Sequence, residues 1–570
     1  MKPVNACFII LIFMLVFAAY FNSLHNDFIW DDEFLVRDNN YIKSFTHIPD
    51  IFKSYLAASS GTVNTFYRPL QELSYTIDHS LWGYKPFGFH LTNLILHGLC
   101  AIAVYLLASM ILKNSLAAFI TAALFGVHPI NTEAVTYVAG RADSLYLLFL
   151  LTSFILFIKS IEIIKAQNRL PAGFYIFSLF FYILSMLSKE IGLILPLLLL
   201  LYIFSFYANS AIKYRLYALS LPFGVIFLVY ALARKTILNF THLVSPFATA
   251  DIGLYNRFLT ALKAICVYLH LFIAPFDLHM ERTILIARSL TQPETLRAIF
   301  VIMLMAIAAW LFYKHSRKLF FASIWFFIGF FPVSNLIPIN SFIAEHWMYL
   351  PSIGIYMIAG TAIAGIFYGN FAKPVSGLVK TIVIFVLIAL LASLSVLTFQ
   401  RNKDWKDSVT FFKNTLKYTP DNARLHLNFG NTYANLGRKE ESIAEYRKAI
   451  ELKPDFPEAY FDLAQAYLGE DNYVEAKKYL EKTLSLKPNF PNALEILGII
   501  EHRQGNLAEA EKYYLAALNI WPEFLKCHIN LGILYIDKGD TAKAISEWQK
   551  VLEIEPNNTE AKQLLSQFVK

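Results

Sequence analysis

The chain has 570 residues, of which 56% are hydrophobic and 16% are charged, and its formal net charge is +7. A positive mean hydropathy over this length excludes a series of ordinary soluble domains and indicates a membrane protein. The basic excess predicts no nucleic-acid partner, because the Lys and Arg residues form short clusters between apolar runs, where they set membrane orientation.

Apolar runs of the length that a bilayer requires fill residues 1–400, whereas residues 401–570 have the composition of charged, soluble helices. The first run, from Cys7 to about Leu24, has no signal-peptide cleavage pattern, and we expect it to be a retained anchor. The positive-inside bias places the N-terminus in the cytoplasm, so residues 25–90 are expected to form the first outer loop.

Further spans are expected near 91–112, 115–127, 143–160, 172–187, 191–208, 216–234, 298–313, 319–333, 348–367 and 380–399. Residues 256–276 are also long enough to cross, but a crossing there would move the basic cluster at 314–318 to the outside. We therefore expect an interfacial or re-entrant segment at 256–276. The result is an all-α bundle of about eleven spans with an extracytoplasmic C-terminal region.

The first outer loop opens with "WDDE", residues 30–33, directly after the first helix. Adjacent carboxylates such as Asp31, Asp32 and Glu33 have three uses outside a membrane: a general base with an orienting neighbour, a divalent-metal site, or solvation of a loop. Because no spacer follows the helix, Asp31 and Asp32 are held at the membrane surface, which favours a catalytic role.

Three basic residues lie in polar motifs on the same expected side. Arg68 belongs to "YRPL", Arg141 to "HPINTEAVTYVAGRAD" and Lys189 to "SKE". Together they can hold an anionic group such as a phosphate. The alternative is a set of local ion pairs, Arg68 with Glu72, Arg141 with Asp143, and Lys189 with Glu190.

Three histidines accompany these motifs. His90 and His97 are seven residues apart on one face of the second span, and His128 opens the next outer loop. Single histidines of this kind are more often hydrogen-bonded packing residues than ligands. No His or carboxylate set has convincing metal spacing, so the sequence predicts no metal site and leaves a divalent cofactor unsupported.

Proline recurs every 34 residues in the C-terminal part, at 420, 454, 488, 522 and 556. That period is typical of tetratricopeptide repeats, which stack into an α-solenoid. Residues 420–570 are expected to form these repeats, and residues 401–419 a half-repeat that bridges them to residues 1–400. Such an array predicts a bound peptide or protein partner, and the alternative is a spacer without a ligand.

These motifs resemble one known family. "DFIWDDEF", "YRPL", "FHLTNLILH", "HPINTEAVTYVAGRAD", "LSKE" and "AEHWMYLPS", followed by repeats, are similar to the transmembrane and tetratricopeptide-repeat O-mannosyltransferases, which are GT-C glycosyltransferases. The resemblance implies an enzyme that transfers a sugar, with inversion, from a polyprenyl- or dolichyl-phosphate carrier in the membrane to a hydroxyl outside the cytoplasm. The sugar implied is mannose, and the acceptor is a Ser or Thr of a protein.

The resemblance also assigns roles to residues. Asp31 and Asp32 match the acidic motif that supplies the base. The expected donor-phosphate residues are Arg68, Arg141, Lys189 and His346; the expected supporting residues are Glu33, His90, His97, His128, Glu133, Asp143, Glu190 and Glu345. The family often has Glu-Arg-Tyr before "LYLPS", whereas this chain has Glu345, His346 and Trp347, which weakens or moves a phosphate-binding role there.

Two alternatives remain open at the level of sequence. Transfer to a cell-envelope glycan or lipid fits the same motifs, because a repeat array can dock an assembly partner as well as a substrate. A non-enzymatic scaffold, in which the spans only anchor the array, predicts that charge removal at Asp31, Arg141 and Lys189 is tolerated.

Overall fold

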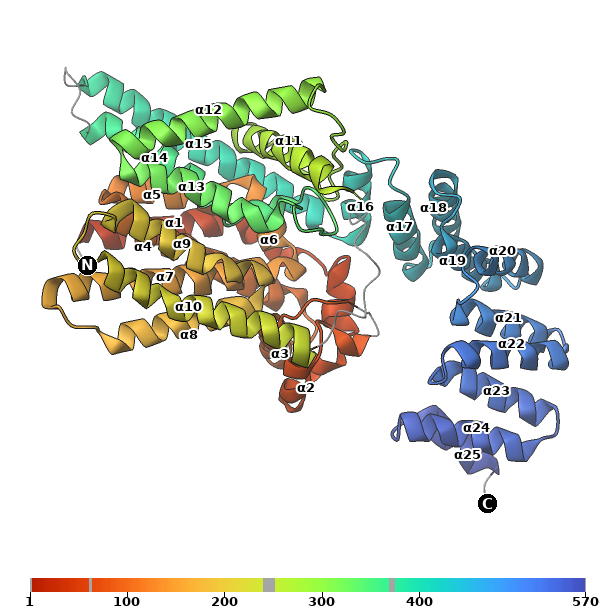
Figure 1. Cartoon of the computed structure of the whole chain (residues 1–570). Coiled ribbons are helices and arrows are strands. Elements are labelled where there is room, and N and C mark those ends of the chain that lie inside the picture. The colour runs from red at the N-terminus through yellow and green to blue at the C-terminus, as the bar shows by residue number, and fades with distance from the viewer. Residues whose placement is uncertain (1–2, 61–63, 239–251, 369–374, 569–570) are drawn as a thin grey trace. The chain divides into compact units, whose positions relative to one another are not determined.

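The computed structural model describes residues 3–60, 64–238, 252–368 and 375–568, and within these ranges its regular elements are helices with no strand. The chain divides into two compact units, Met1–Tyr418 and Thr419–Lys570 (Figure 1). The expected all-α class, an apolar helix bundle followed by repeats, is confirmed.

Eleven helices of the first unit overlap the eleven expected spans. They are α1 (Pro3–Tyr20), α4 (Pro86–Leu112), α5 (Ser115–Val127), α7 (Arg141–Gln167), α8 (Ala172–Ser188), α9 (Leu195–Tyr207), α10 (Lys213–Ala233), α12 (Pro293–His315), α13 (Arg317–Phe330), α14 (Ser352–Tyr368) and α15 (Gly377–Asn402). By length and apolarity, eight helical stretches of the described chain can cross a membrane, or nine if the bent pair 115–127 and 129–136 is one span. The number of crossings therefore stays a prediction.

The bundle helices run alternately between two ends. One end, called here the motif end, carries the polar motifs, and there Thr136 Oγ1 donates to Asn402 Oδ1 at 2.7 Å. At the opposite end, Tyr105 Oη donates to Asn5 Oδ1 at 3.0 Å and Arg215 donates to Asn168 at 2.8 Å. This order matches the alternation expected from the positive-inside bias, although which end faces the cytoplasm remains a prediction.

Helix α11 (Leu254–Ile273) is long and apolar enough to cross, but its neighbours restrict its path. Helix α10 ends at the motif end, where Arg234 donates to Thr65 O at 2.8 Å. Helix α12 runs toward the opposite end, where Lys318 donates to Leu112 O. The chain between α10 and α12 thus starts and finishes at the motif end.

The segment after α11 is extended and lies along this helix, since Ala287 N donates to Thr260 Oγ1 at 3.0 Å. If α11 crossed alone, this extended backbone would have to return through lipid, where its polar groups would lack partners. Whether residues 256–276 cross the membrane therefore stays a prediction.

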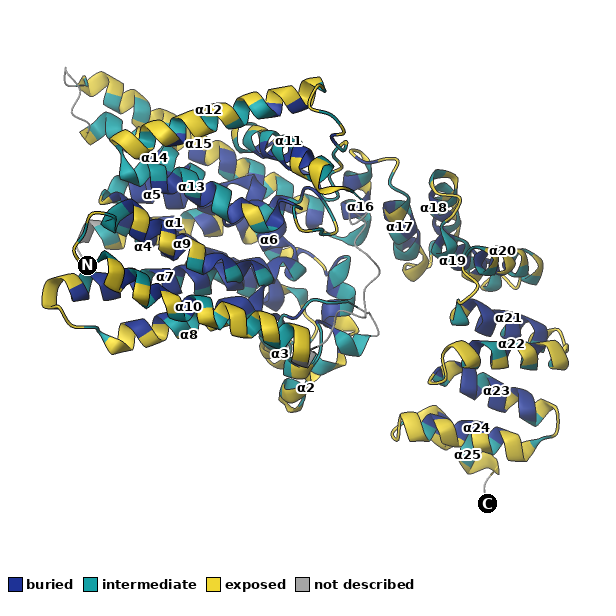
Figure 2. Ribbon diagram, viewed as in Figure 1, coloured by how far each residue is buried: buried dark blue, intermediate teal, exposed yellow. Residues whose placement is uncertain are grey.

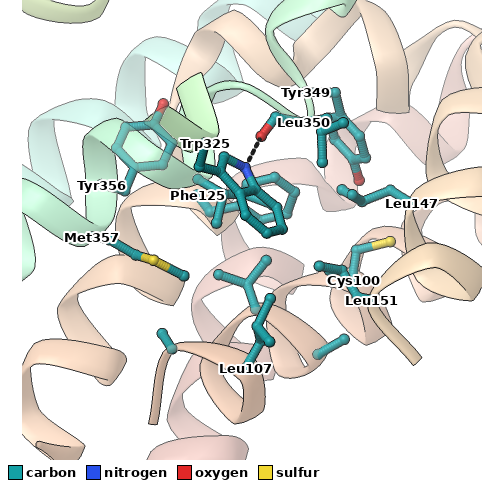
Figure 3. Close-up of a cluster of buried hydrophobic side chains, with 14 of the residues drawn as sticks. Cys100, Leu107, Phe125, Leu147, Leu151, Trp325, Tyr349, Leu350, Tyr356 and Met357 are labelled. Carbon is teal, nitrogen blue, oxygen red and sulfur yellow. Dashed lines mark hydrogen bonds between the residues drawn. The ribbon is translucent and has the colours of Figure 1, made fainter. Parts of the chain in front are cut away.

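The core of the bundle forms where α4, α5, α7, α13 and α14 meet (Figure 3). The Trp325 indole N–H donates to Leu350 O at 3.0 Å. Figure 2 shows exposed faces on α10, α12 and α15, where large apolar side chains such as Leu228, Trp310 and Phe385 are exposed. An apolar exposed face of this kind suits contact with lipid.

The first outer loop folds against the motif end. It contains a short helix at Glu33–Arg37, then α2 (Ile48–Lys53) and α3 (Pro69–Trp82). Glu72 joins these parts, because its buried Oε1 accepts from Asn39 Nδ2 at 2.8 Å and from Ala57 N at 3.0 Å.

The second unit is a series of antiparallel helix pairs. They are α17 (Ala423–Asn435) with α18 (Lys439–Leu452), α19 (Pro457–Leu468) with α20 (Tyr473–Leu486), α21 (Pro491–Arg503) with α22 (Leu507–Ile520), and α23 (Leu525–Asp537) with α24 (Thr541–Ile554), followed by α25 (Thr559–Phe568). A side chain at Gly430, Gly498 or Gly532 would collide with an aromatic ring of the paired helix. The repeated small residues thus permit the close pairing that the 34-residue period predicts.

Candidate active site

A pocket of about 200 Å³ lies at the motif end of the first unit. Its walls come from five separate parts of the chain. They are Asp31, Phe34, Leu35, Leu56, Asn64, Phe66, Arg68, Gln71, Glu133, Tyr137, Ala139, Gly140, Asp143, Lys189, Met280 and His346. Six of the residues predicted from the sequence are thereby brought together: Asp31, Arg68, Glu133, Asp143, Lys189 and His346.

The two adjacent aspartates have different environments. Asp31 lines the pocket, and its backbone N–H donates to Tyr137 Oη at 2.9 Å. Asp32 is fully buried, and its two carboxylate oxygens accept from Ile29 N at 3.1 Å and Ala139 N at 2.8 Å. Burial raises the pKa of the Asp32 carboxyl well above its usual range, although the two backbone donors oppose this effect. Asp31 is thus placed to meet a ligand, and Asp32 to hold the loop.

Lys189 and Arg68 lie on the pocket wall, and each forms an ion pair with a carboxylate. Lys189 Nζ contacts Asp143 Oδ1 and Oδ2 at 2.7 and 2.8 Å, while Arg68 Nη2 donates to Glu190 Oε2 at 3.1 Å. Burial lowers the pKa of Lys189, and Asp143 opposes that change. Asp143 holds the Lys189 ammonium group beside the cavity, and Glu190 holds the Arg68 guanidinium group there.

Arg141 has a different place from the one predicted. Its side chain is fully buried, it is not part of the pocket wall, and its Nη1 contacts Asp78 Oδ2 at 2.5 Å. It also donates to Asn93 Oδ1 and Phe89 O, both at 2.7 Å. These contacts join the start of α7 to α3 and α4.

The three local ion pairs suggested by sequence spacing are wrong as well. Each base pairs with a distant carboxylate instead: Arg68 with Glu190, Arg141 with Asp78, and Lys189 with Asp143. Packing of the helices, rather than distance along the chain, decides these partners.

His346 lies on the pocket wall. Its Nδ1 lies 2.6 Å from Glu133 Oε1, and its backbone N–H donates to Glu133 Oε2 at 3.1 Å. The neighbouring Glu345 is buried outside the pocket, where its Oε2 lies 3.5 Å from Arg401 Nη2. Burial raises the pKa of Glu345 to about 7.

The remaining predicted residues lie away from the pocket. His97 Nδ1 contacts Tyr349 Oη at 2.7 Å and His128 Nε2 contacts Phe272 O at 3.1 Å, so both act in packing. His90 is buried in α4. Glu33 pairs with Arg37 at 2.8 Å on the surface of the loop.

Sequence reasoning missed Tyr137, Gln71 and Met280 on the pocket wall. Tyr137 belongs to the "HPINTEAVTYVAGRAD" motif, and this position could have identified it as a pocket residue. Gly140 of the same motif lets the chain fold back on itself, because a side chain there would lie 2.6 Å from Glu133 O. Met280 follows α11 and had no signal of its own.

Among the described residues, no group of three or more His, Cys, Asp or Glu side chains is arranged to hold a metal ion.

Comparison with known proteins adds to this geometry. A Protein O-mannosyl-transferase from Caenorhabditis elegans is 26% identical over 76% of this chain and 61% of its own length. Protein O-mannosyl-transferases TMTC3 and TMTC1 of Homo sapiens are 26% and 27% identical over 76% and 75% of this chain. The chain resembles protein O-mannosyl-transferases. These relatives confirm the family resemblance that the motifs indicated.

The chain spans 61% of the worm protein O-mannosyl-transferase and 50% and 53% of the two human ones. Family models described as TPR repeat and tetratricopeptide repeat match residues 430–470, 461–523 and 501–568. A solved structure titled "Crystal structure of MamA" is 27% identical with a TM-score of 0.24, and the match covers 26% of this chain and 87% of that one. The repeats predicted from the proline period are confirmed by the family models.

Proposed function

We propose that this protein is a membrane glycosyltransferase that moves mannose from a polyprenyl- or dolichyl-phosphate carrier to a Ser or Thr hydroxyl of a protein. The observation that carries the proposal is the pocket in which Asp31, Arg68 and Lys189 meet from distant parts of the chain. The similarity to proteins named O-mannosyl-transferase supports the choice of sugar and acceptor. The motif end faces the extracytoplasmic side in this proposal.

Asp31 is the general base of the proposed reaction. Its carboxylate accepts the proton of the acceptor hydroxyl while the hydroxyl oxygen bonds to the anomeric carbon and the bond from that carbon to the carrier phosphate breaks, with inversion. Asp32 is a positioning residue, since both of its oxygens are committed to backbone donors.

Arg68 and Lys189 stabilise the phosphate that leaves with the lipid carrier. An arginine has five N–H donors and a lysine three, so their bonds to Glu190 and Asp143 leave donor capacity for an anion. Charge that grows in the transition state is stabilised best by donors already in position, and the two carboxylates hold the cations there. His346 extends the same wall, where its Nδ1 lies 2.6 Å from Glu133 Oε1.

The test uses purified full-length protein in lipid, with dolichyl- and polyprenyl-phosphate mannose, the matching glucose carriers, and serine-containing peptides. Mass spectrometry scores the peptides and any added glycan. Transfer of mannose to peptide by the wild type, lost in the Asp31→Asn variant, is the expected result. Equal product from both proteins would exclude this pocket as the catalytic site, and product on glycan alone would change the acceptor.

A further inference from the structure

Trp30, the residue before Asp31, has an unusual backbone conformation. Its φ is +49°, in the left-handed region that bulky side chains rarely adopt. Such a conformation persists only where the surrounding structure holds it, and it is concentrated at functional sites. The contacts of Trp30 therefore decide where the Asp31 carboxylate lies.

The rings that pack on Trp30 come from the far end of the same unit. Helix α16 (Ser408–Leu416) supplies Phe412, stacked on Trp30 with ring centroids 5.4 Å apart, and Phe411, in an edge contact at 5.4 Å. Phe411 and Phe412 are each only 2% exposed. The indole of Trp30 is thus held against a buried aromatic surface formed 380 residues later in the sequence.

A second route from the same segment reaches Asp31 through Tyr137. The rings of Trp405 and Tyr137 lie 5.3 Å apart, and Trp405 contacts Phe411 at 5.2 Å. Tyr137 Oη in turn accepts the backbone N–H of Asp31. Residues 405–412 therefore contact two groups beside the Asp31 backbone, the ring of Trp30 and the ring of Tyr137.

Backbone and amide bonds support this arrangement. Asp27 N donates to Lys406 O at 2.8 Å, and Asn26 Nδ2 donates to Asn402 O at 3.0 Å. Asn402 also accepts from Thr136, next to Tyr137. Residues 26–30, at the start of the acidic loop, thus contact residues 402–412 through two hydrogen bonds and the ring contacts of Trp30.

We infer that Trp405, Phe411 and Phe412 are positioning residues of the transferase, which hold Trp30 and Tyr137 so that Asp31 faces the pocket. This inference rests on the proposed function for its catalytic consequence. The segment expected from the sequence to be a bridge, 401–419, is in this respect part of the active site.

The test compares Phe412→Ala with Phe429→Ala, a matched control that removes an equally buried ring from α17 in the second unit. Hydrogen–deuterium exchange of peptides covering 26–33 is measured together with mannose transfer from dolichyl-phosphate mannose to a serine-containing peptide. Phe412→Ala is expected to raise exchange in 26–33 and to lower kcat at least tenfold, with the donor KM changed less than threefold. Phe429→Ala should leave both unchanged.

Two further variants separate positioning from general loss of fold. Trp30→Phe retains a ring and should keep most activity. Trp30→Gly keeps the left-handed backbone without strain but loses the ring. It should raise exchange in 26–33 and lower kcat, which tests the inference even if Phe412→Ala fails to fold.

Unchanged exchange at 26–33 in Phe412→Ala and Trp30→Gly, or raised exchange with an unchanged kcat, would overturn the inference. A wild-type protein without transferase activity would instead defeat the proposed function, while the exchange data would still decide whether residues 405–412 hold the loop.

Discussion

Asp31 and Asp32 are neighbours in sequence that differ in burial, and on this ground the proposed function gives them different roles. Asp31 lines the pocket, whereas Asp32 is closed in by the backbone donors of Ile29 and Ala139. The acidic motif alone predicts a base in this pair, but only the fold distinguishes the two residues.

Replacing each aspartate by asparagine should give different results. Asp31→Asn is expected to lower kcat about 100- to 10,000-fold with an unchanged melting temperature, because it removes only the base. Asp32→Asn should lower stability by about 1–3 kcal/mol, since one backbone donor then faces an amide N–H₂ instead of an oxygen. Thermal unfolding and transfer assays on both variants check this, and a fully active, stable Asp32→Asn protein would contradict it.

Arg141 is expected to act through structure rather than on the donor. Arg141→Met should destabilise the protein by about 3–5 kcal/mol, because Asp78 is left as an unpaired buried charge. The double variant Arg141→Met/Asp78→Leu replaces the pair by apolar groups and should recover both folding and transfer. If the double variant folds but its donor KM remains raised many-fold, Arg141 contacts the donor after all.

Glu72 provides a pH-dependent prediction in the first outer loop. Burial raises its pKa from 4.5 to about 7, so the folded protein binds the proton more tightly than the unfolded chain. Its contribution favours folding below about pH 4.5 and is lost as the pH rises to about 7. Glu72→Gln keeps the Oε1 acceptor without titrating. From about pH 4.5 to about pH 7, the free energy of unfolding of Glu72→Gln should rise by roughly 3 kcal/mol relative to that of the wild type. Melting temperatures measured over this range check the change. A difference between the two proteins that does not vary with pH would contradict the raised pKa of Glu72.

At the scale of elements, short turns at the motif end decide the shape of the pocket. The stretch from Thr132 to Gly140 folds so tightly that a Cβ added at Gly140 would lie 2.6 Å from Glu133 O. The same turn places Tyr137 and Ala139 beside the acidic loop.

Gly140→Ala should therefore destabilise the protein by about 1–3 kcal/mol, because the new Cβ meets backbone atoms that cannot move independently. It should also lower kcat by shifting the Ala139 donor that holds Asp32. Gly173→Ala in α8 is the control, since nothing lies within 4 Å of a Cβ there. Equal melting temperatures for the two variants would contradict the close approach.

At the scale of the whole molecule, the boundary between the two compact units decides which residues belong with the pocket. The first compact unit extends to Tyr418 and includes Asn402, Trp405 and α16. The sequence predicts that residues 401–419 form a half-repeat that bridges the tetratricopeptide repeats to residues 1–400. Asn402 contacts Ala19, Asn22 and Thr136, so the start of this segment packs against the bundle.

Two truncations check this point. A chain ending at Tyr418 should transfer mannose to a short peptide at close to the wild-type rate, but should lose its preference for a full-length acceptor. A chain ending at Gln400 should lose activity on both, because it lacks the residues that hold the acidic loop. Equal peptide transfer by the two chains would show that 401–418 has no role in the site.

The sequence by itself determined the helical class, the positions of the apolar helices, the repeat period and the polar motifs that supply the pocket. These features depend on local spacing and composition, which a chain carries without its fold. The tertiary structure decided which charges meet: Arg68 pairs with Glu190 across 122 residues and Lys189 with Asp143 across 46. It also placed Arg141 behind the pocket and Asp31 inside it. Such outcomes depend on how helices pack and on what packing buries, and neither is encoded in the distance between two residues along the chain.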